Sequence, residues 1–370
     1  MDDQVLLDRA FDGFTELPVK GAVDCDVHPA VPGTGALLKY MDDHWREQIV
    51  ERGIDGLDAM SFPPGIGALG REDWRLPAGK PGSDPDRTIK DVLDGFDLSF
   101  AILNCLYHVQ GAYDENMSIG LARAVNNWVK AEWLDRDPRF RASIVIPTES
   151  PELAVDEIDR LASDKRFVQI MMLAGGEIPM GRRFHWPIFR AAEKHGLPIT
   201  VHAGTNYRHA PTSIGWPSFF VEEYVGHPHM FQMQLLSLIT EGVFTKFPNL
   251  KFVFAESGFT WLPPSIWRAN KTWKAMRVET PWVDRPPAEI VRSNFRFTLQ
   301  PSDIALDGTG LAKTIEHIGS DDVILFSTDY PHAHFEGKRA LPPGLSDSQI
   351  RKICIDNPLA TYPRLKEASR

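Results

Sequence analysis

Short runs of apolar residues recur along the chain, each bounded by proline, glycine or charged residues. Most of these runs are apolar at nearly every position, a pattern typical of strands that are buried on both faces of a parallel sheet. Eight runs have this character, and we expect each to form a strand: 22–28 (AVDCDVH), 98–104 (LSFAILN), 141–147 (RASIVIP), 167–173 (FVQIMML), 198–204 (PITVHAG), 251–257 (KFVFAES), 295–300 (FRFTLQ) and 323–329 (VILFSTD).

Helical patterns separate several of these predicted strands. Residues 118–135 repeat apolar positions at spacings of three and four, residues 150–163 open with Ser-Pro-Glu, and residues 186–196 end at a glycine. Alternating strands and helices are typical of a parallel sheet, and eight strands favour a (β/α)8 TIM barrel over an open doubly wound sheet. The first strand is not followed by a glycine-rich nucleotide loop, which weakens the open-sheet alternative.

The segment 30–97 is too long for a simple connection between a strand and a helix, and it is rich in Pro, Gly and Asp. Long loops of this kind are often functional. We therefore expect a single barrel domain over residues 1–370, with 30–97 as a cap-like insertion after the first strand, at the end of the barrel where active sites lie.

Composition restricts the class of protein. A hydrophobic fraction of 43% with 24% charged residues is ordinary for a soluble globular chain, and a net charge of -10 without a polybasic cluster argues against nucleic-acid partners. The three cysteines, Cys25, Cys105 and Cys354, are too far apart for a disulfide framework or a CxxC metal site. The acidic N-terminus and the lack of a run of roughly 20 apolar residues predict a cytoplasmic protein without a membrane span.

The stretch VDCDVHP at residues 23–29 places polar residues at alternate positions of the first predicted strand. Successive side chains of a strand point to opposite faces, so Asp24, Asp26 and His28 would share one face. Turn-forming residues at a strand end before Pro29 would explain the same pattern without any chemistry.

The carboxyl ends of four predicted strands carry side chains that can bind a metal ion. They are Asp26 and His28 on the first strand, His202 on the fifth, Glu256 on the sixth and Asp329 on the eighth. Each alone has an ordinary structural explanation, but in a barrel these ends converge on one cavity. Carboxylate and imidazole together suit Zn, Mn or Fe, so the pattern predicts one divalent metal site.

Several longer motifs together carry a resemblance to a known family. They are DCDVHP, RAVNNWVKAEW, DPRFRASIVIP, LPITVHAG, GVFTKFPNLKFVFAESG, ILFSTDYPH and DNPLATYP, and they span nearly the whole chain. The chain resembles the amidohydrolase-2 branch of the amidohydrolase superfamily, which includes aminocarboxymuconate semialdehyde decarboxylase and resorcylate-type decarboxylases. The resemblance implies one divalent metal ion, zinc by preference over manganese or iron, and it suggests a homodimer.

The same resemblance implies particular metal ligands: Asp26, His28, His202 and Asp329. Asp24 is expected to orient one of these ligands rather than to bind the ion itself. Glu256 departs from the family, because many members carry a histidine at the corresponding place after the sixth strand. A carboxylate there could act as a general base, bind the metal ion or hold a substrate ammonium group, but it cannot carry positive charge.

Further polar and aromatic residues are weaker candidates for substrate binding, because surface positions, a structural arginine and plain packing explain any one of them more readily. The candidates are Arg268, His227, His229, His332 and Trp261.

The leading functional hypothesis is a metal-dependent hydrolase that cleaves a C–N or C–O bond of a small cyclic or aromatic-derived metabolite. Its expected catalytic residues are Asp329, which would shuttle the proton of the attacking water, Glu256 and the ligand His202. The alternative is a non-oxidative, metal-dependent decarboxylase of an aromatic or muconate-type acid, against which Glu256 counts. A third hypothesis is a barrel that binds ligands without catalysis.

Overall fold

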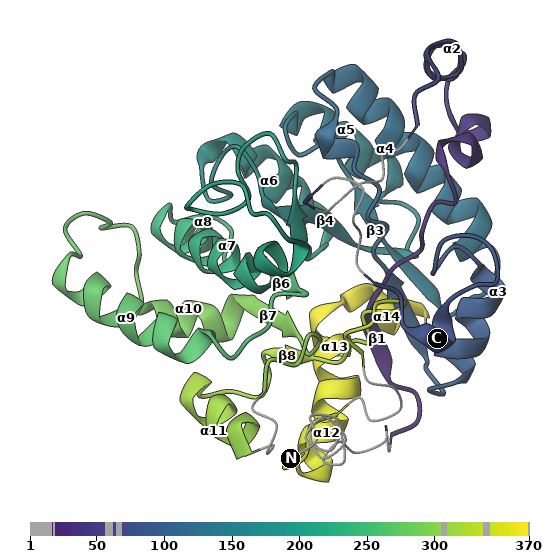
Figure 1. Cartoon of the computed structure of the whole chain (residues 1–370). Coiled ribbons are helices and arrows are strands. Elements are labelled where there is room, and N and C mark those ends of the chain that lie inside the picture. The colour runs from purple at the N-terminus through teal and green to yellow at the C-terminus, as the bar shows by residue number, and fades with distance from the viewer. Residues whose placement is uncertain are drawn as a thin grey trace.

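Eight parallel strands form one sheet in which each strand pairs with the next in the chain, in the order β1 to β8 (Figure 1). The computed structural model describes residues 17, 19–55, 62, 63, 69–304, 309–335 and 341–368. The strands are β1 (Val23–Val27), β2 (Phe100–Leu103), β3 (Phe140–Val145), β4 (Phe167–Gly175), β5 (Ile199–Thr205), β6 (Phe252–Ala255), β7 (Phe295–Thr298) and β8 (Ile324–Leu325).

The predicted (β/α)8 TIM barrel is confirmed, and all eight predicted strands are present. The sheet closes through backbone contacts between β1 and the segment after β8: Cys25 N donates to Phe326 O at 3.0 Å, and a parallel bridge joins Val27 to Tyr330. The prediction of a strand over 323–329 was wrong beyond Leu325. From residue 326 onward the backbone leaves the ladder with β7 and follows β1 instead, so these residues form a loop.

Helices surround the strands (Figure 1). The predicted helices 118–135, 150–163 and 186–196 correspond to α4 continued by η5, to α5 and to α6, and Gly196 ends α6 in the left-handed conformation. The helices are η1 (Thr34–Tyr40), α2 (Asp43–Arg52), η2 (Glu72–Trp74), α3 (Pro85–Thr88), η3 (Ile89–Asp94), η4 (Val109–Gly111), α4 (Glu115–Val129), η5 (Lys130–Leu134), α5 (Pro151–Leu161), η6 (Arg183–His185), α6 (Trp186–His195), α7 (Phe220–Thr240), α8 (Val243–Lys246), α9 (Leu262–Ala275), α10 (Pro287–Asn294), α11 (Thr309–Ile318), α12 (Asp347–Arg351), η7 (Lys352–Asp356), α13 (Asn357–Thr361) and α14 (Pro363–Ala368).

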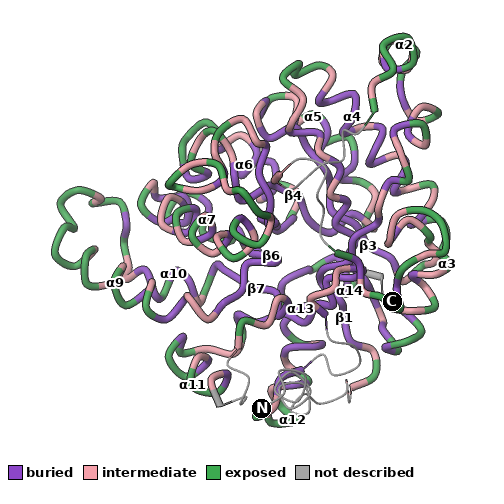
Figure 2. The backbone as a smooth tube through the Cα atoms, in the orientation of Figure 1, coloured by how far each residue is buried: buried purple, intermediate pink, exposed green. Residues whose placement is uncertain are grey.

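Burial follows this arrangement, since the strands are buried along their whole length and the exposed residues lie on the outer helices and loops (Figure 2). One large apolar cluster joins the strands to the helices around them. A smaller cluster packs residues of β1, β2, β4, β6 and β8 against Tyr362 and Leu365. No helix in the described ranges has both the length and the apolar character needed to cross a membrane.

The described part of the segment 30–97 lies against the ends of β1 and β8. Arg71 N donates to Pro331 O at 2.9 Å, next to the end of β8. Gly82 has φ +78, and a Cβ atom there would lie 2.5 Å from the carbonyl oxygen of His28. Only glycine allows this close approach with that backbone conformation.

Candidate metal centre

The carboxyl ends of β1, β5, β6 and β8 bring acidic and imidazole side chains to one place. The five residues are at most 6% exposed, and they are Asp26, His28, His202, Glu256 and Asp329. The barrel topology explains this convergence, because parallel strands that are distant in sequence end at the same face.

Glu256 and Asp329 share an uncommon backbone conformation. Both have φ +57, in the left-handed region that costs a residue with a side chain roughly 1–2 kcal/mol. Hydrogen bonds hold both turns: Glu256 N donates to Thr298 Oγ1 at 3.0 Å, and Asp329 N donates to Asp26 O at 3.0 Å. Such conformations persist where the surrounding structure imposes them, and they are concentrated at functional sites.

The potential ligand atoms of the cluster lie close together. His28 Nε2 is 2.9 Å from Asp329 Oδ1 and 3.3 Å from Asp26 Oδ1. His202 Nε2 is 3.5 Å from Asp26 Oδ2 and 3.5 Å from Glu256 Oε2. Two imidazole nitrogens therefore face three carboxylates across one small space.

Hydrogen bonds at the far side of each ring set which nitrogen faces this space. His28 Nδ1 lies 3.0 Å from Asn104 O, and His202 Nδ1 lies 2.8 Å from Ala203 O. A backbone carbonyl can only accept, so each Nδ1 is the protonated donor. Neutral rings would then present the Nε2 lone pair, which is the form that binds a metal ion.

A buried polar network from β2, β3 and β4 holds Asp26. Asn104, which follows β2, donates from Nδ2 to Asp26 Oδ1 at 2.7 Å. The amide oxygen of Asn104 in turn accepts from Ser143 Oγ and, at 3.1 Å, from Gln169 Nε2. This arrangement leaves Oδ2 of Asp26 directed toward His202.

Asp24 lies beside the cluster rather than in it. Its carboxylate accepts hydrogen bonds from Asp26 N at 3.1 Å and from the backbone and hydroxyl of Thr328. Burial raises the pKa of Asp24 to about 7, against the effect of these hydrogen bonds. Asp24 thus connects the β1 ligand pair to the loop that carries Asp329.

The electrostatics of the cluster favour positive charge at its centre. Burial alone would raise the pKa values of Asp26 and Asp329, but neighbouring imidazoles outweigh burial and hold both below their usual range. Burial alone would lower the pKa of His28, yet Asp26 and Asp329 raise it to about 10. Asp26 and Asp329 are therefore anionic and attract a cation.

The donor set fits a divalent metal ion. Two groups of side chains have donor atoms within 4.8 Å of one another: Asp26, His28 and His202, and His28, Glu256, Asp329 and His332. Within the described part of the chain, Asp26 Oδ2, His202 Nε2 and Asp329 Oδ2 are buried without a hydrogen-bond partner. Buried polar atoms normally have partners, and mixed carboxylate and imidazole ligands are those that Zn, Mn and Fe accept.

The residues predicted for substrate binding are distributed unevenly around this centre. His332 joins it: Nδ1 lies 2.7 Å from Asp329 Oδ1, and its ring stacks on that of His28 at 4.7 Å. His227 is buried on α7, with Nε2 3.8 Å from Glu223 Oε1, and no contact among the described residues joins it to the ligand atoms.

Trp261, His229 and Arg268 are not brought to the ligand atoms. Trp261 holds the turn after Glu256, since its Nε1 donates to Ser257 O at 2.9 Å. His229 is exposed on α7 and lines a surface groove of about 710 Å³. Arg268 is exposed on α9, and no hydrogen bond or ion pair within the described ranges links it to the cluster.

Tyr224 and Asn104 both lie next to the centre, and neither was predicted from the sequence. The ring of Tyr224 on α7 stacks on that of His334 at 4.3 Å and 3°, and His334 Nδ1 lies 4.0 Å from Asp329 Oδ2. Burial, followed by the charges of Glu256 and Asp329, raises the pKa of Tyr224 well above its usual value. Nothing in the local sequence marks Tyr224, whereas Asn104 could have been found by its place directly after β2.

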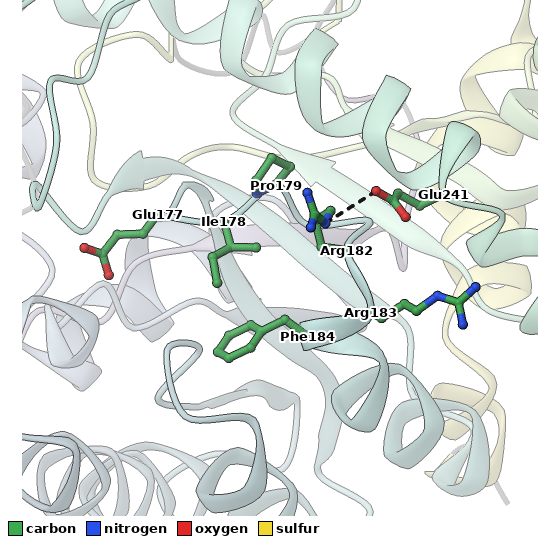
Figure 3. A pocket seen from close by; sticks show the side chains of 7 residues that line it. All are labelled: Glu177, Ile178, Pro179, Arg182, Arg183, Phe184 and Glu241. Carbon is green, nitrogen blue, oxygen red and sulfur yellow. Dashed lines mark ion pairs between the residues drawn. The ribbon is translucent and has the colours of Figure 1, made fainter. Parts of the chain in front are cut away.

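A separate pocket of about 550 Å³ contains none of these ligands. It lies between the loop after β4 and the end of α7, where Arg182 and Glu241 face each other across 3.6 Å (Figure 3). Arg183 points away from this pair (Figure 3). The pocket is lined by side chains of both charges, and none of its lining residues belongs to the metal centre. We assign this pocket no role.

An eight-stranded barrel with carboxylates and imidazoles at the carboxyl ends of its strands defines the class of TIM-barrel proteins that can hold a metal ion at that end. Residues 23–364 match the family model described as Amidohydrolase, and the chain therefore belongs to this amidohydrolase family. The family expected from the sequence motifs is confirmed.

Relatives of this chain include named decarboxylases. The chain is 26% identical over 247 residues to gamma-resorcylate decarboxylase of Rhizobium sp. (strain MTP-10005), covering 62% of this chain and 71% of that protein. It is 24% identical over 258 residues to 2-amino-3-carboxymuconate-6-semialdehyde decarboxylase of Dictyostelium discoideum, covering 67% of each.

A solved structure with the same fold comes from Polaromonas sp. JS666. It is a dihydroxybenzoic acid decarboxylase with bound manganese and the inhibitor 2-nitroresorcinol. The TM-score is 0.64 and the identity 20%, over 95% of this chain and 98% of that chain. At this identity the likeness shows the fold.

Proposed function

We propose that this protein is a metal-dependent, non-oxidative decarboxylase of a small aromatic or related unsaturated carboxylic acid. The observation that carries the proposal is the buried cluster of Asp26, His28, His202 and Asp329 at the carboxyl ends of the strands, in a family whose relatives here are decarboxylases. The relatives support this alternative better than the hydrolase that the sequence analysis ranked first.

Four residues would hold the metal ion: Asp26, His28, His202 and Asp329. A bound divalent ion supplies a Lewis acid that orients the substrate and stabilises negative charge that develops during the reaction. The cluster does not discriminate zinc from manganese. Manganese in the Polaromonas decarboxylase supports manganese as an equal candidate beside zinc.

Decarboxylation breaks the bond between the carboxyl carbon and the ring, leaves its electron pair on the ring carbon and requires a proton there. His332 and Asp329 are placed to manage this proton, because His332 Nδ1 donates to Asp329 Oδ1 at 2.7 Å. The side chain of His332 is 14% exposed, whereas those of His28 and His202 are 5% and 0% exposed. His332 can therefore exchange protons with solvent. General acid catalysis of this kind contributes about 10²–10⁴-fold.

The described part of the segment 30–97 would cover the substrate in this site. Its contacts to Pro331 and to the carbonyl of His28 support this role, since they place it beside two strands that carry metal ligands. Covering the site would exclude water, which favours proton transfer to carbon over hydrolysis. The family resemblance also supports a homodimer, which the molar mass in solution would test.

Product analysis tests the reaction. The metal-loaded protein would be incubated in H₂¹⁸O with gamma-resorcylate, other hydroxybenzoates, and small lactones and amides. We expect release of CO₂ with no ¹⁸O in the remaining organic product. Incorporation of ¹⁸O into a new carboxyl or hydroxyl group without CO₂ release would instead establish hydrolysis.

A further inference from the structure

Glu256 lies among the metal ligands, at a strand end where many family members have histidine. It follows β6 directly, is 6% exposed and is held at φ +57. Asp329, an implied ligand, has the same φ after β8. Two acidic residues are thus held in the same unfavourable conformation with their carboxylates directed at one space.

The distances from His28 and His202 to the neighbouring carboxylates are close to those between atoms that surround one ion. Two ligand atoms that are each about 2.1 Å from an ion, at angles of 90–109°, lie about 3.0–3.4 Å apart. The separations of His28 Nε2 from Asp329 and Asp26 are 2.9 and 3.3 Å. Glu256 Oε2 is 3.5 Å from His202 Nε2, which equals the separation of Asp26 Oδ2 from that nitrogen.

Hydrogen bonding does not explain this arrangement of His202. Its Nδ1 donates to Ala203 O, and within the described ranges its buried Nε2 has no hydrogen-bond partner. A ring with its proton on Nδ1 presents a lone pair at Nε2, and this lone pair faces the carboxylates of Asp26 and Glu256. Two carboxylates that approach one buried imidazole nitrogen require positive charge at that place, which a metal ion bound to Nε2 would supply and a proton on Nε2 would supply in its absence.

We infer that Glu256 is a direct ligand of the bound metal ion, together with Asp26, His28, His202 and Asp329. The inference rests on the proposed function in that it requires a metal ion at this site. The ion then receives three carboxylates and two imidazoles, an oxygen-rich set that suits manganese or iron better than a site with histidine in place of Glu256.

Metal binding tests the assignment without reference to activity. Protein freed of metal by a chelator would be titrated with Mn²⁺ by calorimetry, for the wild type and for Glu256→Gln and Glu256→Asp. We expect Glu256→Gln to raise the Kd for Mn²⁺ by about 10–100-fold or more, since even residues that only orient a ligand have effects of that size. Glu256→Asp keeps the charge but withdraws the carboxylate by one methylene, and we expect an intermediate loss.

Glu149→Gln is the matched control. Glu149 follows β3, is partly exposed and accepts a hydrogen bond from Asn206 at 2.8 Å, and the amide can preserve this contact. We expect its Kd for Mn²⁺ to equal that of the wild type. Thermal unfolding of the metal-free proteins shows whether each variant is folded.

The absorption spectrum of the Co²⁺-substituted protein provides a second measure. Loss of a ligand changes the number of donors around the ion, so the visible bands should change in Glu256→Gln. An unchanged spectrum and an unchanged Kd in Glu256→Gln, with activity lost, would overturn the assignment and make Glu256 an acid or base. A wild type that binds neither Mn²⁺ nor Co²⁺ would overturn both this inference and the proposed function.

Discussion

Asp24 and Thr328 are joined by two hydrogen bonds although they lie 304 residues apart in the chain: Thr328 N donates to Asp24 Oδ1 at 3.0 Å, and Thr328 Oγ1 donates to Oδ2 at 2.6 Å. Asp26 N also donates to Asp24 Oδ1, at 3.1 Å. Asp24 therefore connects the strand that carries Asp26 and His28 to the loop that carries Asp329. These hydrogen bonds hold Asp329 at a fixed distance from the two ligands on β1.

Replacement of Asp24 by alanine should lower the free energy of unfolding by about 3 kcal/mol, because three buried donors lose their acceptor. It should also weaken metal binding. Asp24→Asn is the control. Its amide oxygen can accept from the two backbone N–H groups, and its amide nitrogen can donate to Thr328 Oγ1, which reverses the third hydrogen bond. Because burial raises the pKa of Asp24 to about 7, a neutral group there should change stability by less than about 1 kcal/mol. Urea denaturation measures the free energy of unfolding of both variants. An equal decrease of this free energy in Asp24→Ala and Asp24→Asn would contradict this account.

Replacement of Asp329 by asparagine should reduce decarboxylation by at least about 100-fold, because the amide lacks the negative charge that binds the metal ion and cannot take up a proton from His332. A chelator should abolish wild-type activity, and added Mn²⁺ or Zn²⁺ should restore it. Asp347→Asn, at an exposed position of α12, should have wild-type rates. Turnover of Asp329→Asn within a few-fold of wild type would rule out these roles.

Replacement of Asn104 by alanine should raise the Kd for the metal ion by about 10–100-fold, since Asn104 donates to Asp26 Oδ1 at 2.7 Å and orients that ligand. Ser143→Ala removes only one donor to Asn104 and should have a smaller effect. Calorimetric titration of the metal-free variants compares them. A larger increase of the Kd in Ser143→Ala than in Asn104→Ala would contradict the interpretation that Asn104 contacts Asp26 directly and Ser143 acts through Asn104.

His185, remote from the metal centre, should make stability depend on pH. Burial lowers the pKa of His185 to about 4, whereas an unfolded histidine titrates near 6.5. Between pH 6.5 and pH 4 the unfolded chain therefore binds a proton at His185 that the folded chain does not bind. The corresponding part of the free energy of unfolding is fully present above pH 6.5 and is lost as the pH falls toward 4. Between pH 7.5 and pH 5 this loss should be about 2 kcal/mol.

Urea denaturation at both pH values would compare the wild type with His185→Gln, in which the contribution of His185 to the pH dependence should be absent. His44→Gln, at an exposed position of α2, should retain the full dependence. The same slope in all three proteins would show that His185 does not couple folding to protons.

The strands and the strand-end residues could be predicted because both depend on local pattern. Continuous apolar runs mark strands buried on two faces, and a barrel brings their carboxyl ends together whatever lies between them. The eighth strand was predicted too long, since residues 326–329 are as apolar or as small as strand residues. Only their pairing with β1 and Asp24 places them in a loop.

Tyr224 could not be predicted as a neighbour of the centre. It lies on α7, which contains Pro228, a residue that normally ends helices and so obscures the pattern. Its stacking on His334 joins residues 110 positions apart by number, and no local periodicity reports such a contact. Arg268, which was predicted from its charge, lies exposed on α9, and no hydrogen bond or ion pair within the described ranges links it to the centre.

The sequence by itself determined the barrel and the identity of the residues that gather at its carboxyl end, because strand periodicity and strand-end position are local properties of the chain. The family followed from the resemblance of its longer motifs. Only the tertiary structure decided the geometry at Glu256. The turn after β6, the hydrogen bond to Thr298 and the 3.5 Å approach to His202 depend on contacts between three strands. Those contacts place the carboxylate of Glu256 beside His202, and they group it with His28 and Asp329 as potential ligands of one ion.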